Sequence, residues 1–532
     1  MRIPSAPFLS ALSLAAAMML ATPASAQDTD TAPAATMEQV EQAWQKGDFV
    51  FVRDGLKQLA EAEGSTPLAQ YRYGRVLIEG RGGPKDLEGA VDWLGKAAAQ
   101  NQMEAMTLLA RIYLSNISQN QDNPTDLKRD PAKAADLLSR AAALGNAEAQ
   151  YYLAMLYESG DGVEKDDKAA FNWLLAAAGQ EYVEAQYELS RFYSRGTGTE
   201  ANSDEALRWL ERAAGNNHIK SQYYLAAAYE SGRGVNQSMS EAVSWYRRAA
   251  ENGLPIAMRN LGTLYLQGEA VKQNAEEGLR WLETAAEASD SGAMGNLGMA
   301  YATGLGVEKN DETAADWYNR ASEHGLGRAK VALGLFHEVG RGVEQDIERA
   351  IALYEQALET PDAGQAAHQL ARLAAHGTLD GRIAPQRAIP WALYAAQSGD
   401  EAAEAWVETQ AEAGLRNAQA GLAMLWLGRE DHAADGVKWL ELAALSGEPG
   451  AQVRLGEMHM TGTHVELDYV AAHKWFNIAA TLGATKAADL RETVSALMTP
   501  EDVAEAQAAA RHWFEQEEPQ PPETQQSVTV AE

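Results

Sequence analysis

Histidine is the residue type whose distribution most suggests a reactive or metal-binding site in this chain. Three histidines, His459, His464 and His473, lie within 15 residues, and imidazole nitrogen is a preferred ligand of zinc. Seven of the ten histidines follow residue 360, and these are His368, His376, His432, His459, His464, His473 and His512. The C-terminal third is therefore the first place to look for chemistry.

Spacing along the chain argues against a metal site there. His459 stands 16 residues before Trp475, and His337 stands 16 residues before Leu353. Both histidines occupy a position that tyrosine holds elsewhere in a recurring pattern, so a half-buried, aromatic-like role explains them. The dipeptide at 337–338 is His-Glu, but the second histidine of a zinc-protease helix does not follow. We therefore predict no metal ligands.

Other catalytic signatures are also missing from the sequence. It contains no Gly-x-Ser-x-Gly elbow, no Ser-x-x-Lys, no Walker lysine loop and no cysteine. Its Gly-x-Gly turns follow a helix and recur periodically, which favours helix capping over phosphate binding. The carboxylates of Asp166 and Asp167 stand at an expected helix start, where capping is their ordinary role. We predict no catalytic or cofactor-binding residues, and the sequence does not assign the partner-binding ones.

The strongest pattern is a ladder of aromatic residues with a period of 36. The tryptophans are Trp173, Trp209, Trp245, Trp281 and Trp317. A tyrosine precedes each of them by 16 residues, namely Tyr157, Tyr193, Tyr229, Tyr265 and Tyr301. We call these two positions the Trp slot and the Tyr slot. A fixed period of this length is typical of a stacked array of one supersecondary unit.

Each unit has the pattern of two amphipathic helices joined by a glycine-rich turn. In one copy, apolar residues recur at helical spacing over 149–157 and 170–178, and Gly-Asp-Gly-Val occupies 160–163. One position of the unit holds a small residue that lets helices approach closely. Alanine occupies it in five copies, as Ala177, Ala213, Ala249, Ala285 and Ala321. A single hairpin cannot bury its apolar face, so stability must come from stacking.

The array is irregular at two places. From Trp93 to Leu137, which takes the next Trp slot, the step is 44 residues, and we place an insertion of 8 residues within 115–130. Leu353 takes the slot after Trp317, followed by Trp391, Trp439 and Trp475. The step from Trp391 to Trp439 is 48 residues, which predicts an extra or degenerate helix within 400–416. Counting slots gives about eleven repeats.

These residues carry a resemblance to the Sel1-like repeat, a relative of the tetratricopeptide repeat. The matching motifs include Asn-Leu-Gly-Thr-Leu-Tyr at 260–265, the Gly-x-Gly-Val turns and Trp-Tyr at 317–318, and they recur from about residue 69 to 480. The resemblance implies an all-α, right-handed solenoid of helix-turn-helix repeats with a concave face that binds proteins. It implies no catalytic residues, because the family signature is structural.

The two ends of the chain carry different signals. Arg2, an apolar run at 8–20 and Ala-Ser-Ala at 24–26 predict a secretory signal peptide cleaved after Ala26. Thr499, followed by Pro500 and two acids, predicts the start of a closing helix. The expected order is signal peptide 1–26, flexible lead-in 27–36, N-terminal helical cap 37–68, repeat array 69–484, C-terminal capping helices 485–514 and disordered tail 515–532.

Charge and composition narrow the function classes. With 44 Lys and Arg against 75 Asp and Glu, the net charge of −31 argues against nucleic acid and anionic membrane surfaces as partners. The absence of cysteine excludes disulfides and lipidation at an N-terminal cysteine. No stretch outside the signal peptide approaches the ~20 apolar residues of a spanning helix. We expect a periplasmic protein without a membrane anchor.

Three functions remain open from sequence. We prefer a non-enzymatic scaffold or adaptor that binds protein partners, since the resemblance implies roles in envelope assembly, exopolysaccharide export or restraint of sensor kinases. A peptidoglycan- or glycan-binding protein is the alternative, and it needs aromatic residues outside the slots, for which Trp406 and Trp426 are the candidates. A cell-wall hydrolase, described for some Sel1-like proteins, has no support in these residues.

Overall fold

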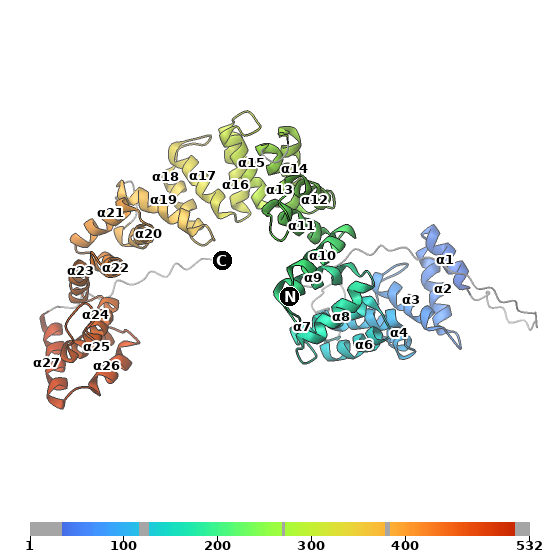
Figure 1. Ribbon diagram of the computed structural model, residues 1–532, viewed down its shortest axis with the longest axis horizontal. Helices are drawn as coiled ribbons and strands as arrows, with labels where there is room; N and C mark the ends of the chain where they lie inside the picture. The colour runs from blue at the N-terminus through green and yellow to red at the C-terminus, as the bar shows by residue number, and fades with distance from the viewer. Residues whose placement is uncertain (1–34, 116–126, 269–271, 378–383, 517–532) are drawn as a thin grey trace, which may run out of the picture. The chain divides into compact units, whose positions relative to one another are not determined.

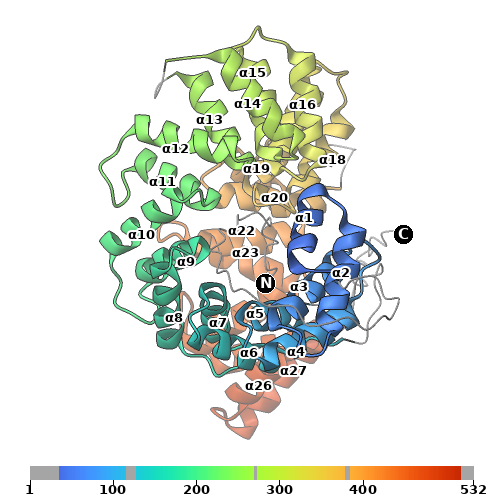
Figure 2. The same ribbon diagram turned by 90° about the vertical axis from the view of Figure 1, so that its right-hand side faces the viewer.

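The computed structural model describes residues 35–115, 127–268, 272–377 and 384–516, where all the regular secondary structure is α-helical. Two compact units divide the chain, Met1–His218 and Ile219–Glu532. Each is a succession of helix pairs (Figure 1), and Figure 2 shows the same helices from the side. We call the two members of a repeat its first and second helix. The predicted all-α solenoid of tandem repeats is confirmed.

The first unit contains α1 to α10: α1 Met37–Lys46, α2 Phe49–Glu61, α3 Pro67–Glu79, α4 Leu87–Ala99, α5 Met103–Leu114, α6 Pro131–Ala143, α7 Ala147–Ser159, α8 Asp167–Gly179, α9 Val183–Arg195 and α10 Ser203–Gly215.

The second unit contains α11 to α27: α11 Ile219–Ser231, α12 Met239–Glu251, α13 Pro255–Gln267, α14 Ala275–Glu287, α15 Ser291–Thr303, α16 Asp311–Glu323, α17 Gly327–Val339, α18 Ile347–Ala357, α19 Ala363–Ala375, α20 Pro385–Gln397, α21 Glu401–Glu412, α22 Arg416–Leu427, α23 Ala433–Leu445, α24 Pro449–Thr461, α25 Tyr469–Thr481, α26 Ala487–Ser495 and α27 Pro500–Gln516.

The helix boundaries follow from capping residues in the sequence. Asp166 accepts hydrogen bonds from the backbone N–H groups of Lys168 and Ala169, at 3.0 and 2.9 Å, and so starts α8. Asn202 starts α10 in the same way. At the other end of a first helix, Gly160 closes α7 with φ of 73°, in the left-handed region that glycine enters without a Cβ clash. Both capping predictions are confirmed.

The second glycine of the turn has a role that capping does not explain. A Cβ on Gly198 would lie 2.0 Å from the carbonyl oxygen of Asp167, the first residue of the preceding repeat's second helix. Gly342 approaches Asp311 in the same manner, at 2.2 Å. In these copies the Gly-x-Gly motif therefore combines a helix stop with a close backbone contact between neighbouring repeats, whereas a Cβ on Gly234 would meet nothing within 4 Å. Attributing the whole motif to capping was incomplete.

Alanine holds the most buried positions of the repeat. The small-residue position predicted from sequence is 0% exposed in each regular copy: Ala177, Ala213, Ala249, Ala285 and Ala321. The tryptophans lie further out. Trp245 and Trp317 are half-buried, and an arginine three residues later covers each ring, with Arg248 at 4.4 Å and Arg320 at 4.0 Å from the ring centroids. In these two copies the Trp slot therefore seals the edge of the core, whereas Trp209 and Trp475 are buried within it.

Buried glutamines join each repeat to the one before it. Gln150 on α7 donates from Nε2 to the carbonyl of Ala142 near the end of α6, at 3.1 Å, and its Oε1 accepts from Gln180 at the end of α8, at 2.7 Å. The bond to the preceding helix recurs at Gln186, Gln419 and Gln452. Because these side chains are 0 to 6% exposed, such bonds are needed to offset the burial of a polar amide.

The array is flanked by helices at both ends. At the N-terminal end, Thr36 and Gln39 form a capping box on α1, and Ala35 is buried in the core of the cap. These two residues, 35 and 36, belong to the cap and not to the predicted flexible lead-in. At the C-terminal end, Thr499 caps α27 by accepting from the N–H of Asp502 at 3.2 Å. Helix α27 ends at Gln516, beyond the predicted end at 514.

The irregular segments can be placed among these helices. Helices α5 and α6 border the segment 115–130, of which 116–126 lie outside the described residues. Trp391 lies on α20, paired with α19, and α21 occupies the segment for which the long step to Trp439 predicts an extra helix. The predicted signal peptide and most of the predicted tail fall outside the described ranges.

Candidate functional site

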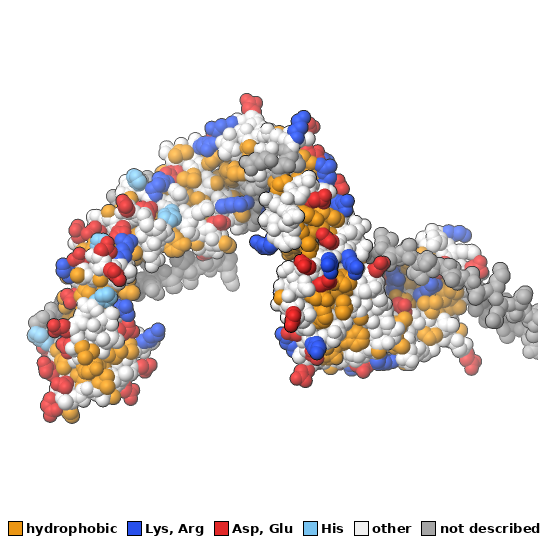
Figure 3. Space-filling view, viewed as in Figure 1, with side chains coloured by type: hydrophobic (Ala, Val, Ile, Leu, Met, Phe, Trp, Pro, Cys, Tyr) orange, Lys and Arg blue, Asp and Glu red, His pale blue; other side chains and the backbone are white. Residues whose placement is uncertain are grey.

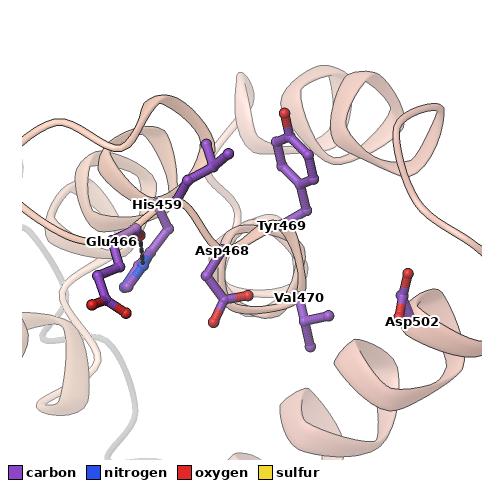
Figure 4. A pocket seen from close by; sticks show the side chains of 7 residues that line it. His459, Glu466, Asp468, Tyr469, Val470 and Asp502 are labelled. Atoms are coloured by element: carbon purple, nitrogen blue, oxygen red, sulfur yellow. Dashed lines mark hydrogen bonds between the residues drawn. The ribbon is translucent and has the colours of Figure 1, made fainter.

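The C-terminal histidine region borders an open depression on the surface. The depression has a volume of about 430 Å³ and is lined by the loop between α24 and α25, the start of α25 and the side chain of Asp502 on α27. Figure 4 shows the imidazole of His459 turned toward the backbone of Glu466, whose carbonyl lies 3.3 Å from Nδ1. Asp468 and Tyr469 point in different directions. In the described part of the chain, no three His, Cys, Asp or Glu side chains lie close enough to hold a metal ion.

Helix capping accounts for the carboxylates of this depression. Asp468 accepts from the N–H of Ala471 at 2.9 Å and starts α25. Asp502 accepts from the N–H of Thr499 at 3.1 Å at the start of α27. Both groups are held in place by backbone donors, which is the geometry of a cap and not that of a general base facing a substrate.

The remaining members of the histidine cluster are separated by their surroundings. His464 is exposed in the loop after α24, with φ of 61°. His473 is 2% exposed on α25, and its Nδ1 has no hydrogen-bond partner among the described residues. Burial, and then the positive charge of Arg491, hold the pKa of His473 below its ordinary value. A neutral, buried imidazole serves here as a core side chain.

The two tryptophans outside the slots are also packed into the core. Trp426 is 8% exposed, donates from Nε1 to Glu404 at 2.7 Å and stacks on His432 with ring centroids 5.3 Å apart. Trp406 is partly buried against the core around α20 and α22. Sugar-binding tryptophans present a ring face to solvent, which burial prevents at Trp426 and packing limits at Trp406.

The first helices of the N-terminal unit carry a different kind of surface, rich in tyrosine. We call it the tyrosine face, and it comprises Tyr71 on α3, Tyr151 and Tyr152 on α7, Tyr182 before α9 and Tyr187 on α9, all half-buried. The ring of Tyr151 lies 5.2 Å from that of Tyr152 and 5.4 Å from that of Tyr182. Tyr187 stacks on His218 at 4.7 Å. Tyrosine and tryptophan are the residues most enriched in protein interfaces, since they combine apolar area with a hydrogen-bonding end.

Two ion pairs lie on this face, one between successive first helices and one within a helix. Arg111 on α5 bonds Glu148 on α7 at 2.9 Å, and its guanidinium lies 5.6 Å from the ring of Tyr152. Glu188 pairs with Arg191 within α9. Both pairs remain partly accessible, with exposed fractions between 13% and 37%.

The pKa values of these groups show that they share one environment. Burial raises the pKa of Glu148 against the opposing effect of Arg111, and burial likewise raises the pKa of Glu188 against Arg191. Burial raises the pKa of Tyr71 against the opposing effect of Arg75, and Glu104 and Glu148 on the next two first helices add to the rise. Burial is therefore the largest cause of the pKa shift at each of these groups.

In the C-terminal unit the tyrosine pair recurs on α11, where the rings of Tyr223 and Tyr224 lie 5.4 Å apart, and polar contacts take its place on α13 and α15. Arg259 on α13 bonds both carboxylate oxygens of Asp290, at 3.0 and 3.2 Å. Asn296 on α15 donates to Thr263 at 3.0 Å. On the side of the molecule shown in Figure 3, acidic and basic side chains are interspersed over most helices. First helices α13 and α15 thus differ in chemistry from α7 and α9.

Sequence reasoning placed the tyrosines at 157, 193 and their equivalents, but it did not identify the tyrosine face. Its members stand five or six positions into a first helix, or just before one, where the repeat fixes no residue type. A signal was available, because tyrosine recurs at 71, 151, 187 and 223, the fifth position of α3, α7, α9 and α11. A residue type that recurs at a position which the family pattern leaves free therefore indicates a candidate binding surface in such arrays.

Comparisons with known proteins place the chain. The Sel1 repeat model matches ten segments: 67–102, 104–146, 147–182, 183–218, 219–254, 255–290, 291–326, 327–359, 417–448 and 449–483. The repeat that carries Trp391 lies in the unmatched stretch between the segments 327–359 and 417–448. No curated protein matches the chain.

Solved structures show the same fold. A protective antigen of uropathogenic Escherichia coli with an SLR fold is 26% identical over 90% of this chain and 94% of its own, with a TM-score of 0.54. A Sel1 repeat protein from Oxalobacter formigenes is 28% identical over 63% of this chain and 90% of its own, with a TM-score of 0.44. The repeated aromatic slots, the glycine turns and the family model together show that this chain belongs to the Sel1 repeat family.

Proposed function

We propose that this chain is an exported, non-enzymatic scaffold that binds protein partners at the cell envelope. Sel1 repeat proteins generally mediate protein–protein interaction. The observation that supports a binding role for this chain is the tyrosine face, a half-buried aromatic surface at α3, α7 and α9 with an ion pair that joins α5 to α7. Such a surface offers rigid aromatic anchors and adaptable polar contacts to a polypeptide.

Export and an envelope role rest on the sequence. The signal-like segment 1–26 and the absence of cysteine support delivery to the periplasm, with cleavage after Ala26. No helix in the described ranges is long and apolar enough to span a membrane. Within the envelope we favour a regulator or assembly factor for a membrane-associated complex. Expression of the full chain, fractionation and N-terminal sequencing test this point, and an unprocessed protein in the cytoplasm would refute it.

The alternative functions have less support. A glycan-binding protein requires exposed tryptophans, and Trp406 and Trp426 are packed against neighbouring helices. A hydrolase requires a nucleophile or an acid–base pair facing a cleft, and the carboxylates of the depression near His459 are engaged in capping.

Site-specific photocrosslinking tests the scaffold directly. A photoreactive phenylalanine analogue replaces Tyr152 in the tyrosine face, and the matched control carries it at Leu175, an exposed residue on the adjacent second helix. We expect one dominant protein adduct from the envelope fraction at position 152 and a much weaker one at 175. Equal labelling at the two positions, or adducts with glycan alone, would contradict the proposal.

A further inference from the structure

One repeat of the N-terminal unit has lost the tryptophan of its Trp slot. The residue there is Leu137 on α6, which lies 36 residues before Trp173. Tyr113 on α5 retains the Tyr slot of the same repeat, because the 8 added residues lie between the two positions. The repeat therefore has one of its two sealing aromatic residues and lacks the other.

The other repeats show what the missing ring does. Trp93 packs its ring against that of Tyr73 on the facing first helix, with centroids 5.7 Å apart. Trp281 reaches back along its own helix to bond Glu277, four residues earlier, at 2.9 Å. A slot indole therefore covers the preceding turn of its helix and the facing first helix.

In the α5–α6 repeat, an open hollow is found at this place. It has a volume of about 450 Å³ and is lined by Leu109, Tyr113, Ala132, Lys133, Asp136 and Leu137. Leu109 corresponds in the repeat to Tyr73, and Lys133 corresponds to Glu277, so the lining residues are those that a slot indole would cover. The volume falls within the ~300–1,000 Å³ typical of ligand pockets.

The chemistry of the rim suits an aromatic ring. Leu109 and Leu137 supply an apolar floor, and the ammonium of Lys133 lies 5.5 Å from the ring centroid of Tyr113. A cation beside an aromatic slot can contact the face of an inserted ring. Arginine three residues after the slot, which covers the rings of Trp209, Trp245 and Trp317, is retained here as Arg140.

This repeat also departs from the family pattern in a second way. Its insertion leaves from the ends of α5 and α6, next to Tyr113, Ala132 and Lys133. Insertions in repeat proteins lie on one face of the array, which is often the face that binds partners. The segment 115–130 contains no aromatic residue, so it has no ring with which to replace the indole.

We propose that this hollow is a docking site for an aromatic side chain, tryptophan above all, on a protein partner. The partner's ring takes the place that the chain's own indole takes in other repeats. The assignment of the ring to a protein partner rests on the proposed scaffold function. It adds a second contact point, separate in character from the tyrosine face, and it explains why one repeat lacks both its tryptophan and the regular turn.

A titration with N-acetyl-tryptophanamide tests the hollow without a known partner. The purified chain carries labelled leucine methyl groups, and the Leu109 methyl resonances report on binding. Leu137→Trp supplies the missing indole, while Leu144→Trp places an indole at an exposed position at the end of the same helix. Ala132→Phe fills the hollow from its exposed rim. It is the second filled variant and replaces Leu137→Trp in the comparison if that substitution lowers the melting temperature.

We expect a saturable shift of the Leu109 methyl resonances in the wild type and in Leu144→Trp. In Leu137→Trp and Ala132→Phe, the affinity for N-acetyl-tryptophanamide should fall at least roughly tenfold, as for loss of a hot-spot pocket. Absence of a saturable shift in the wild type, or unchanged affinity in both filled variants, would overturn the proposal. Crosslinking from Tyr152 is then repeated with Leu137→Trp. If the adduct persists at full yield although the probe site is blocked, the scaffold function stands and the partner docks elsewhere.

Discussion

The buried glutamine of α7 provides a quantitative test of how repeats are joined. Gln150→Met preserves the length of the side chain and removes both of its hydrogen bonds, to Ala142 and to Gln180. The carbonyl of Ala142 keeps a bond from the N–H of Gly145 at 3.0 Å, and Gln180 is exposed and can bond water. Neither partner is therefore stranded. With about 0.5–1.5 kcal/mol for each lost bond and some return from burying an apolar side chain, we expect a destabilisation of about 1–2 kcal/mol.

Hydrogen exchange read by mass spectrometry is the suitable assay, because repeat arrays open locally and a single unfolding midpoint averages over them. A loss of about 1–2 kcal/mol corresponds to roughly 5- to 30-fold faster exchange in peptides from α6 and α7. The control, Gln180→Met, removes only the exposed partner of one bond and should change exchange by a few-fold at most. Unchanged exchange around Gln150 in Gln150→Met would refute the view that these amides hold neighbouring repeats together.

Three further predictions concern other parts of the repeat. Trp245→Ala should lower stability by about 2–4 kcal/mol, toward the lower part of the range for aromatic truncation because the ring is half-buried, and a melting temperature that hardly moves would contradict its sealing role. Gly198→Ala should cost about 2 kcal/mol more than Gly145→Ala, since both glycines have positive φ but only Gly198 lies against a neighbouring backbone; equal melting temperatures would refute the contact. Burial holds the pKa of Glu188 above its ordinary value, so the folded chain binds that proton more tightly and stability falls as pH rises through the interval between the unfolded and folded pKa values. Glu188→Gln should therefore raise the melting temperature at neutral pH and lose this advantage below the ordinary glutamate range, and a loss of stability at neutral pH would show that the pair with Arg191 outweighs burial.

The framework of the fold could be predicted because it repeats. Ala177 and its equivalents, the glycine after each first helix and the capping Asp and Asn residues each recur many times in one chain, so the pattern supplies its own comparison. The half-buried state of His337 and His459 follows from the same periodicity.

The close approach of Gly198 to Asp167 and the hollow beside Leu137 could not be predicted from that pattern. Both depend on how one repeat lies against another, and periodicity within a sequence does not contain that geometry. The tyrosine face was missed for a related reason, since its members occupy positions that packing leaves free to vary. Functional residues in this chain are therefore expected at positions where the repeat fixes no residue type and in repeats that depart from the regular pattern.

The buried glutamines give the array a direction. Gln150, Gln186 and Gln452 each complete the end of the helix before them, so a repeat depends for this bond on its successor and not on its predecessor. Shortening the chain from its C-terminal side would remove the glutamine donor, but the carbonyl it bonded keeps a backbone bond, as Ala142 does from Gly145. Shortening it from the N-terminal side would remove the acceptor carbonyl and leave the glutamine amide of the first retained repeat without this bond, so that growth and loss of repeats by recombination should be tolerated unequally at the two ends.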